Sequence, residues 1–123
     1  MKTKPLTFLL ALTFLFLFTS SCSDNFQDAT DAYERKDYET AYKLVLPLAE
    51  QGHAKAQYNL GLMYVNGQGV PQDYVSAHMW WNLSGSNGHK DAVKERNIVE
   101  KKMSPSQIEK AQELARNWKP TSK

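Results

Sequence analysis

The stretch AKAQYNLGLMYVNGQGVPQDYVSAHMWWNLSGSNG, residues 54–88, decides the fold of this chain. Its first third predicts a helix, because apolar side chains recur at helical spacing on one face centred on Leu60. The segment NGQGVP, residues 66–71, should end that helix, since glycine adopts the left-handed cap and proline cannot continue the hydrogen-bond ladder. Asp73 is a good N-cap for a second helix. The stretch therefore predicts two antiparallel helices joined by a glycine-rich turn.

Two positions in this hairpin carry predictions about packing. Gly61 lies inside the first helix, where glycine costs about 1 kcal/mol relative to alanine. We therefore expect a neighbouring helix to approach closely at Gly61. Trp80 lies beside the apolar stripe of the second helix, and we expect its ring to be part of the core.

Fragments of the stretch recur along the chain at an offset of 36 residues. Six identities fall within 20 positions, where about one is expected by chance. The repeated residues are Asp37, Tyr38, Ala41, Gly52, His53 and Ala56, which match Asp73, Tyr74, Ala77, Gly88, His89 and Ala92. The chain is therefore an array of repeats.

The units on either side are imperfect copies. Residues 28–35 and 38–51 predict a first helix pair with a short connection, in which Pro47 should kink or weaken the second helix. Residues 90–103 and a helix capped by Ser104 predict a last pair with a polar outer face, as a terminal repeat needs. The apolar side chains expected to pack in this last pair are Ala92, Val93, Ile98, Val99, Met103, Ile108, Ala111, Leu114, Ala115 and Trp118.

The predicted fold class is all-α, a short right-handed α-solenoid of about three antiparallel helix pairs. The helical domain should span residues 27–118, and residues 119–123 should form a loose C-terminal tail.

The segments AQYNLGLMY and NGQGV, followed by Asp73, Ala77 and Trp80, resemble the Sel-1-like repeat, a relative of the tetratricopeptide repeat. The resemblance extends with gaps over about residues 26–118. Many such repeats have two alanines where this chain has Ser84 and Gly85, so we expect the helix to fray early there.

A second apolar face on the helix of residues 54–66 suggests a contact surface. Tyr58, Leu62 and Val65 lie opposite Leu60 at i, i+4 and i+7 and form a second contact face for a partner. The alternative is that Leu62 and Val65 simply pack between repeats. The resemblance implies that the first helices of the units line a concave binding side. It thereby assigns Tyr58, Asn59 and Leu62 to that side, with Gln27 and Asp31 as their counterparts in the first unit. Such side chains suit an extended peptide or a partner helix.

The first residues predict a targeting segment. Lys2 and Lys4 precede an apolar run of 13 residues, 6–18, which is too short to cross a hydrocarbon core of about 30 Å. Residues 1–21 are therefore predicted to be a signal peptide. The lone Cys22 after small residues resembles the lipobox of bacterial lipoproteins, which implies lipidation of Cys22 and a tether over residues 22–26. The other reading is a soluble periplasmic or secreted protein with an unpaired thiol. Ser23, in place of the aspartate that retains such lipoproteins at the inner membrane, implies the periplasmic face of the outer membrane.

Charge and residue pattern narrow the function classes. Without Lys2 and Lys4, 13 basic side chains face 13 acidic ones, so no nucleic-acid partner is expected. His53 and His89 occupy one repeat position, and His78 has no acidic residue or cysteine at ligand spacing. We therefore expect no metal, no cofactor and no enzymatic activity.

The function predicted from these features is a membrane-tethered adaptor that binds a protein or peptide partner in the bacterial envelope. The alternatives are a module that binds or modifies peptidoglycan and homotypic assembly through the end repeats. A monomer is favoured over a homo-oligomer, because the last unit has a polar outer face.

Overall fold

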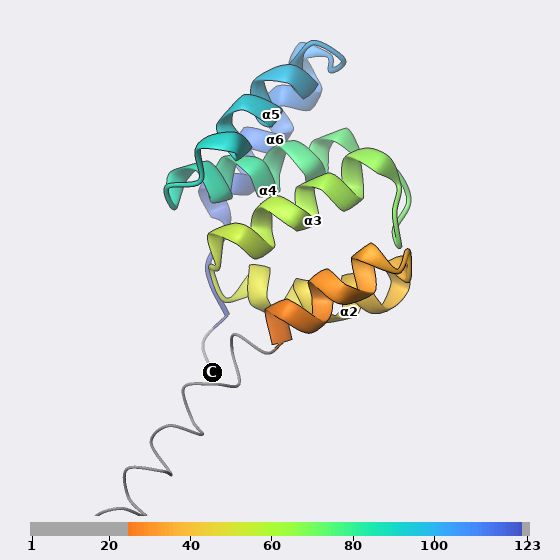
Figure 1. Cartoon of the computed structure of the whole chain (residues 1–123). Coiled ribbons are helices and arrows are strands. Elements are labelled where there is room, and N and C mark those ends of the chain that lie inside the picture. Colours follow the sequence, from red (N-terminus) through yellow and green to blue (C-terminus); the bar gives the residue numbers. More distant parts are fainter. Residues whose placement is uncertain (1–24, 122–123) are drawn as a thin grey trace, which may run out of the picture.

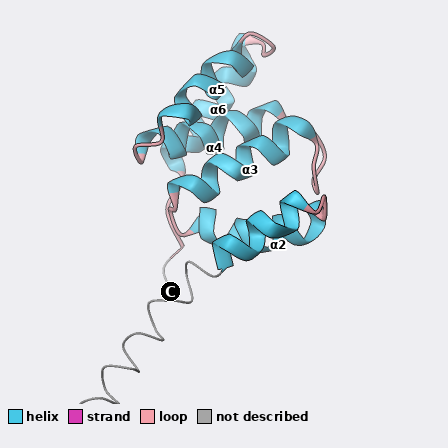
Figure 2. Cartoon of the chain, viewed as in Figure 1, coloured by secondary structure: helices cyan, strands magenta, loops and turns pink. Residues whose placement is uncertain are grey.

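The structure, a computed structural model that describes residues 25–121, contains only helices within that range (Figure 1). The first helix covers residues 25–34, and the others follow after short loops (Figure 2). They are α2 (Tyr38–Glu50), α3 (Ala54–Asn66), α4 (Tyr74–Ser86), α5 (Lys90–Glu100) and α6 (Pro105–Asn117). The prediction of an all-α solenoid is confirmed. The predictions for residues 1–21 and for Cys22 lie outside the described residues.

The full repeat, α3 and α4, lies in the middle of the array. Helix α3 contacts α2 and α4, and α4 contacts α3, α5 and α6. Within residues 25–121, every helix is too short or too polar to span a bilayer.

One side of the full repeat packs against the first unit in an apolar core, which we call the first core. The ring of Trp80 is 6% exposed and meets Trp118 of α6 edge to face, with 6.2 Å between ring centroids. Tyr42 and Tyr64 also meet edge to face, across α2 and α3. The buried members of the first core are Ala29, Ala32, Ala41, Val45, Leu48, Ala49, Ala56, Leu60, Met63, Trp80 and Leu83. The prediction that Trp80 is buried is confirmed.

The other side of the full repeat packs on α5 in a smaller core, the second core, formed by Ala77, Trp81, Ala92 and Val99. The indole of Trp81 lies directly over Gly61, where an added methyl group would overlap the ring. Its Nε1 donates to the carbonyl oxygen of Tyr58 at 3.1 Å. The close approach predicted at Gly61 is confirmed.

The local signals at the helix ends are confirmed. Gly67 ends α3 in the left-handed conformation, with φ of 66°. The Asp73 side chain caps α4 by accepting from the backbone N–H groups of Val75 and Ser76. Ser104 and Gln107 form a capping box at the start of α6.

Several expected boundaries need correction. The first helix includes residues 25 and 26, and Phe26 packs against the first core, so the tether cannot extend to residue 26. Helix α2 runs through Pro47 to Glu50 without interruption. Leu48 and Ala49, which follow that proline, are buried in the first core, and this packing offsets the hydrogen bond that proline removes.

The expectation that α4 frays at Ser84 and Gly85 is wrong, because the helix continues to Ser86. Ser84 is fully buried, and its Oγ donates to the carbonyl oxygen of Ala54 at 2.7 Å. Gly85 admits Val93 of α5, whose Cγ2 would lie 2.7 Å from an added Cβ. Two small residues therefore serve helix packing here rather than helix ending.

The C-terminal unit also departs from expectation. Helix α5 ends at Glu100, and two side chains expected to pack, Ile98 and Leu114, are 52% and 42% exposed. The tail is not loose over its described part, because the backbone N–H of Thr121 donates to the carbonyl oxygen of Glu50 at 2.8 Å. This bond joins Thr121 to the last residue of α2.

Candidate binding surface

A pocket of about 290 Å³ opens between the first helix and α3. We call it the first pocket; its lining residues are Thr30, Tyr33, Glu34, Asn59 and Leu62. The Tyr33 hydroxyl donates to Oε1 of Gln68 at 2.7 Å, which holds the tyrosine ring in place. The pocket therefore combines a fixed aromatic ring, an aliphatic side chain, an amide and a carboxylate.

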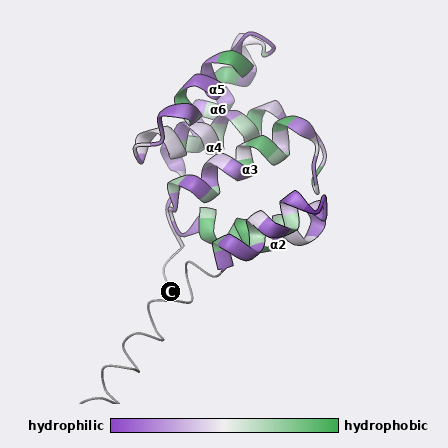
Figure 3. Cartoon of the chain, in the orientation of Figure 1, coloured by the Kyte–Doolittle hydropathy of each residue, from purple (hydrophilic) through white to green (hydrophobic). Residues whose placement is uncertain are grey.

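A second pocket, of about 190 Å³, opens on the other side of α3, between α3 and α5. Its lining residues are Val65, Asn66, Trp81, Glu95, Ile98, Val99 and Lys102. Ile98 is the most exposed large hydrophobic side chain of the described residues. Figure 3 shows hydrophobic segments on the ribbons of α3 and α5, interrupted by hydrophilic ones. The two pockets make the surface of the first helix, α3 and α5 the candidate binding surface.

The predicted binding residues are distributed unevenly over this surface. Asn59 and Leu62 line the first pocket, beside Thr30, Tyr33 and Glu34 of the first helix. Gln27 and Asp31 are absent from the pocket lining, and the Nε2 of Gln27 donates to Oδ1 of Asp31 at 3.0 Å. The binding role assigned to these residues stays a prediction.

Tyr58 has a packing role. Its ring stacks on His89 with 4.4 Å between centroids and 16° between planes. Burial raises the pKa of the Tyr58 hydroxyl, and the carboxylates of Glu95 and Asp91 raise it further. His89 in turn accepts from the backbone N–H of Ala92 through Nδ1 and so caps α5. Tyr58 therefore packs on the start of the next unit, and the binding role assigned to it stays a prediction. Leu62 and Val65 do both: they pack against the second core and line the pockets.

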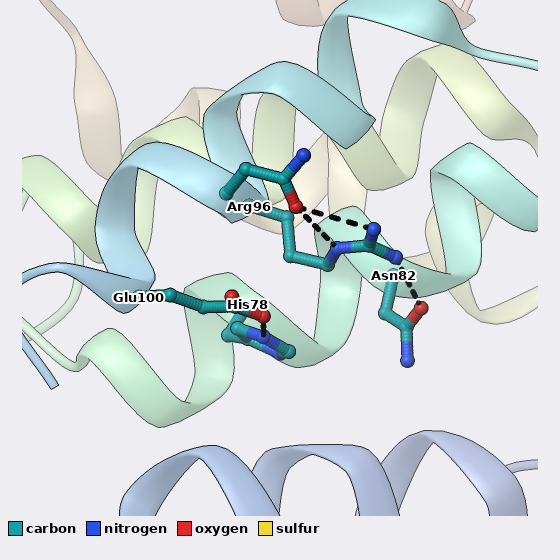
Figure 4. Close-up of polar contacts among 5 residues, drawn as sticks. His78, Asn82, Arg96 and Glu100 are labelled. Atoms are coloured by element: carbon teal, nitrogen blue, oxygen red, sulfur yellow. Dashed lines mark hydrogen bonds and ion pairs between the residues drawn. The ribbon is translucent and has the colours of Figure 1, made fainter. Parts of the chain in front are cut away.

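Helices α4 and α5 are joined by a pair of polar contacts that we call the polar ladder (Figure 4). Nε2 of His78 lies 2.8 Å from Oε1 of Glu100. One turn away, Nη1 of Arg96 donates to Oδ1 of Asn82 at 2.9 Å. Residues 78 and 82 on α4 thus face residues 100 and 96 on α5, as antiparallel i, i+4 pairs do.

The sequence interpretation of His78 was incomplete. Its acidic neighbour lies 22 residues away, beyond any local ligand spacing. The matching i, i+4 pairs on two successive antiparallel helices are the signal that would have found it. The ring of His78 is 1% exposed, and its Nδ1 is buried without a hydrogen-bond partner. Residues 25–121 contain no cluster of three or more potential metal ligands among histidine, cysteine, aspartate and glutamate.

Comparison with known proteins agrees with the repeat pattern. The Sel1 repeat family matches residues 30–53 and 54–89. A stretch of 63 residues, 51% of this chain, is 35% identical to DAP3-binding cell death enhancer 1 from Rattus norvegicus and from Mus musculus. The crystal structure of a protective antigen of uropathogenic Escherichia coli strains, which displays an SLR fold, superposes over 76% of this chain with a TM-score of 0.73 and 31% identity. The chain spans 12% of each mammalian relative and 21% of the bacterial one.

Proposed function

We propose that this chain, a Sel1-like repeat protein, is an adaptor that binds a protein or peptide partner on the surface of its first helix, α3 and α5. The observation that carries the proposal is the pair of pockets on either side of α3. Adjacent hollows that combine apolar floors with a few polar groups are typical of binding sites.

Exposure of Ile98 supports this choice of surface. Unlike the exposed Leu114, Ile98 shares a pocket lining with other apolar side chains, Val65, Trp81 and Val99, so its exposed area is part of a larger apolar surface. A partner side chain placed over Ile98 would bury that apolar area. The name of the mammalian relatives states that they bind DAP3, and we take from it only that a protein containing such repeats binds another protein.

We further propose that the protein is held in the bacterial envelope, on the periplasmic face of the outer membrane, through lipidation of Cys22. The geometry of the domain suits such a tether. The chain enters the domain at the start of the first helix, whereas the pockets are lined by residues in the later parts of the first helix, α3 and α5. A partner bound there would lie away from the point of attachment.

Site-specific crosslinking tests the binding proposal. A photoreactive amino acid at Asn59, in the first pocket, should give one defined crosslinked protein in bacterial envelopes. Ile98→Asp should remove that product, and Leu114→Asp should leave it unchanged. Leu114 is the matched control, because it is an exposed large hydrophobic residue on α6 and lines neither pocket.

Other products of the same crosslinking experiment would contradict the proposal. Crosslinks to peptidoglycan fragments would indicate a cell-wall module. A crosslinked dimer of this chain would indicate homotypic assembly. The tether is tested separately by comparing the intact mass and detergent partitioning of wild type and Cys22→Ser. A wild type that carries no acyl mass and partitions like Cys22→Ser would exclude the lipid anchor.

A further inference from the structure

The first pocket is acidic. Glu34 is the only carboxylate that lines it, and no lysine or arginine lines it. Asp31 lies three residues earlier on the same helix, so it presents its charge one turn away on the same side. Arg35 and Lys36 follow in the turn and do not contribute to the lining. The C-terminal end of the first helix adds the negative end of its dipole. A cation is therefore the favoured occupant of the first pocket.

The rest of the first pocket fits the remainder of a basic side chain. Leu62 and the ring of Tyr33 provide apolar surface for an aliphatic stem, as long cationic side chains require. The side-chain amide of Asn59 provides an acceptor beside the carboxylate of Glu34. A charge-assisted hydrogen bond to Glu34 would be stronger than a neutral one.

The lining of the second pocket combines apolar side chains with an amide and two opposite charges. Ile98 lies on α5, between Glu95 one turn earlier on the same helix and Lys102 in the turn that follows α5. Val65, Val99 and Trp81 add further apolar surface to the lining. Since the two charges at the rim are opposite, this pocket favours an uncharged apolar side chain.

We propose that the partner presents an extended segment that places a lysine or arginine in the first pocket and an aliphatic or aromatic side chain in the second. This inference rests on the proposed function and specifies the chemistry of its partner. The pockets lie on either side of α3, so a segment that fills both has to cross this helix. The recognised segment therefore combines a basic residue with an apolar residue.

Peptide selection tests this specificity. Random twelve-residue peptides displayed on phage are selected against the purified full-length protein, and binding of the selected peptides is measured by fluorescence anisotropy. Lysine or arginine should be enriched together with leucine, isoleucine or phenylalanine in the same peptides. Glu34→Lys should weaken binding of a selected peptide at least tenfold and should shift a new selection toward aspartate or glutamate at the basic position. Ile98→Asp should remove the apolar preference.

Matched variants separate these effects from general changes in charge or stability. Glu113→Lys and Leu114→Asp make the same substitutions at exposed positions of α6 and should leave peptide binding unchanged. Glu34 is exposed at the end of a helix, where a lysine is favourable, so Glu34→Lys should fold normally.

The possible outcomes of the selection separate this inference from the proposed function. Selected peptides that lose binding on Ile98→Asp but show no basic residue, or whose binding is unaffected by Glu34→Lys, overturn this inference and leave the proposed function standing. Selection of no peptide whose binding depends on Glu34 or on Ile98 contradicts both.

Discussion

Trp80 and Trp81 are neighbours in the chain, yet they belong to different interfaces of the full repeat. The ring of Trp80 lies in the first core, against Trp118. The ring of Trp81 lies in the second core, over Gly61. The first core is large and apolar, whereas the second has four buried apolar residues and is supplemented by the polar ladder.

The two interfaces contribute to the free energy of unfolding in different ways. Apolar burial contributes roughly in proportion to area and is insensitive to protonation. A buried polar pair contributes little net free energy, but removing one partner leaves the other unsatisfied. We therefore expect the interface with the first unit to dominate the free energy of unfolding, and the interface with α5 to depend on particular partners.

The largest expected effect is at the first core. Trp80→Ala should lower the free energy of unfolding by about 3–5 kcal/mol, because it removes a large buried ring and leaves a cavity. Urea unfolding followed by circular dichroism measures the loss. Leu114→Ala, at an exposed position, should change stability by less than about 0.5 kcal/mol. Equal stability of Trp80→Ala and wild type would show that the ring does not support the first core.

Overpacking tests the second core. Gly61→Ala should cost about 1–3 kcal/mol, although alanine is the better helix former, because the added methyl group overlaps the Trp81 indole. Gly85→Ala should cost less, since it meets only the end of the Val93 side chain. Thermal melts of the two variants give the comparison. A stabilised Gly61→Ala would mean that Trp81 moves freely away from α3.

Substitutions in the polar ladder should lower the free energy of unfolding by less than those in either core. Glu100→Ala should cost about 1–2 kcal/mol, the lower part of the range for an orphaned group, because Glu100 is 34% exposed while His78 is buried. Glu100→Gln keeps an acceptor oxygen and should recover most of the loss. Chemical unfolding at pH 7 distinguishes the variants. If alanine and glutamine have the same effect, the contact with His78 is not the cause.

The smallest expected effect concerns acid. Hydrogen bonds from the side chain and backbone N–H of Thr40 lower the pKa of Asp37, the N-cap of α2, below its ordinary value of 3.8. An acidic group whose pKa is lower in the folded state than in the unfolded state stabilises the folded protein. This stabilisation is complete at pH values above the unfolded-state pKa and is lost as the pH falls through the folded-state pKa. Asp37→Asn keeps a cap without the charge. The difference between its urea unfolding midpoint and that of wild type should be smaller at about pH 2.5 than at about pH 6. A difference that is the same at both pH values would contradict a stabilising role for the Asp37 charge.

Local features were predictable because their causes lie within a few residues. The glycine-rich turn, the left-handed Gly67 and the Asp73 cap follow from backbone sterics and short-range hydrogen bonds. The 36-residue offset followed from repetition itself, and Gly61 revealed a close helix contact because it is costly anywhere else. Asn59 and Leu62 were also identified as surface candidates, but their neighbours Thr30, Tyr33 and Glu34 were not.

The apolar periodicity predicted burial of side chains in the last helix pair that are in fact exposed, and the reason is physical. It identifies which face of a helix is hydrophobic but not whether another helix covers that face. Leu62 has α5 beside it, whereas Ile98, the residue 36 positions later, has no further helix in the described chain to cover it and is 52% exposed.

The helices, their caps and their order can be read from the amino-acid sequence, because they depend on contacts within one or two turns. Which distant side chains meet became clear from the packed structure. It brought His78 to Glu100, Thr121 to Glu50 and Glu34 to the pocket of Asn59. These contacts depend on how whole helices stack, and stacking is set by the summed packing of many side chains rather than by any local pattern.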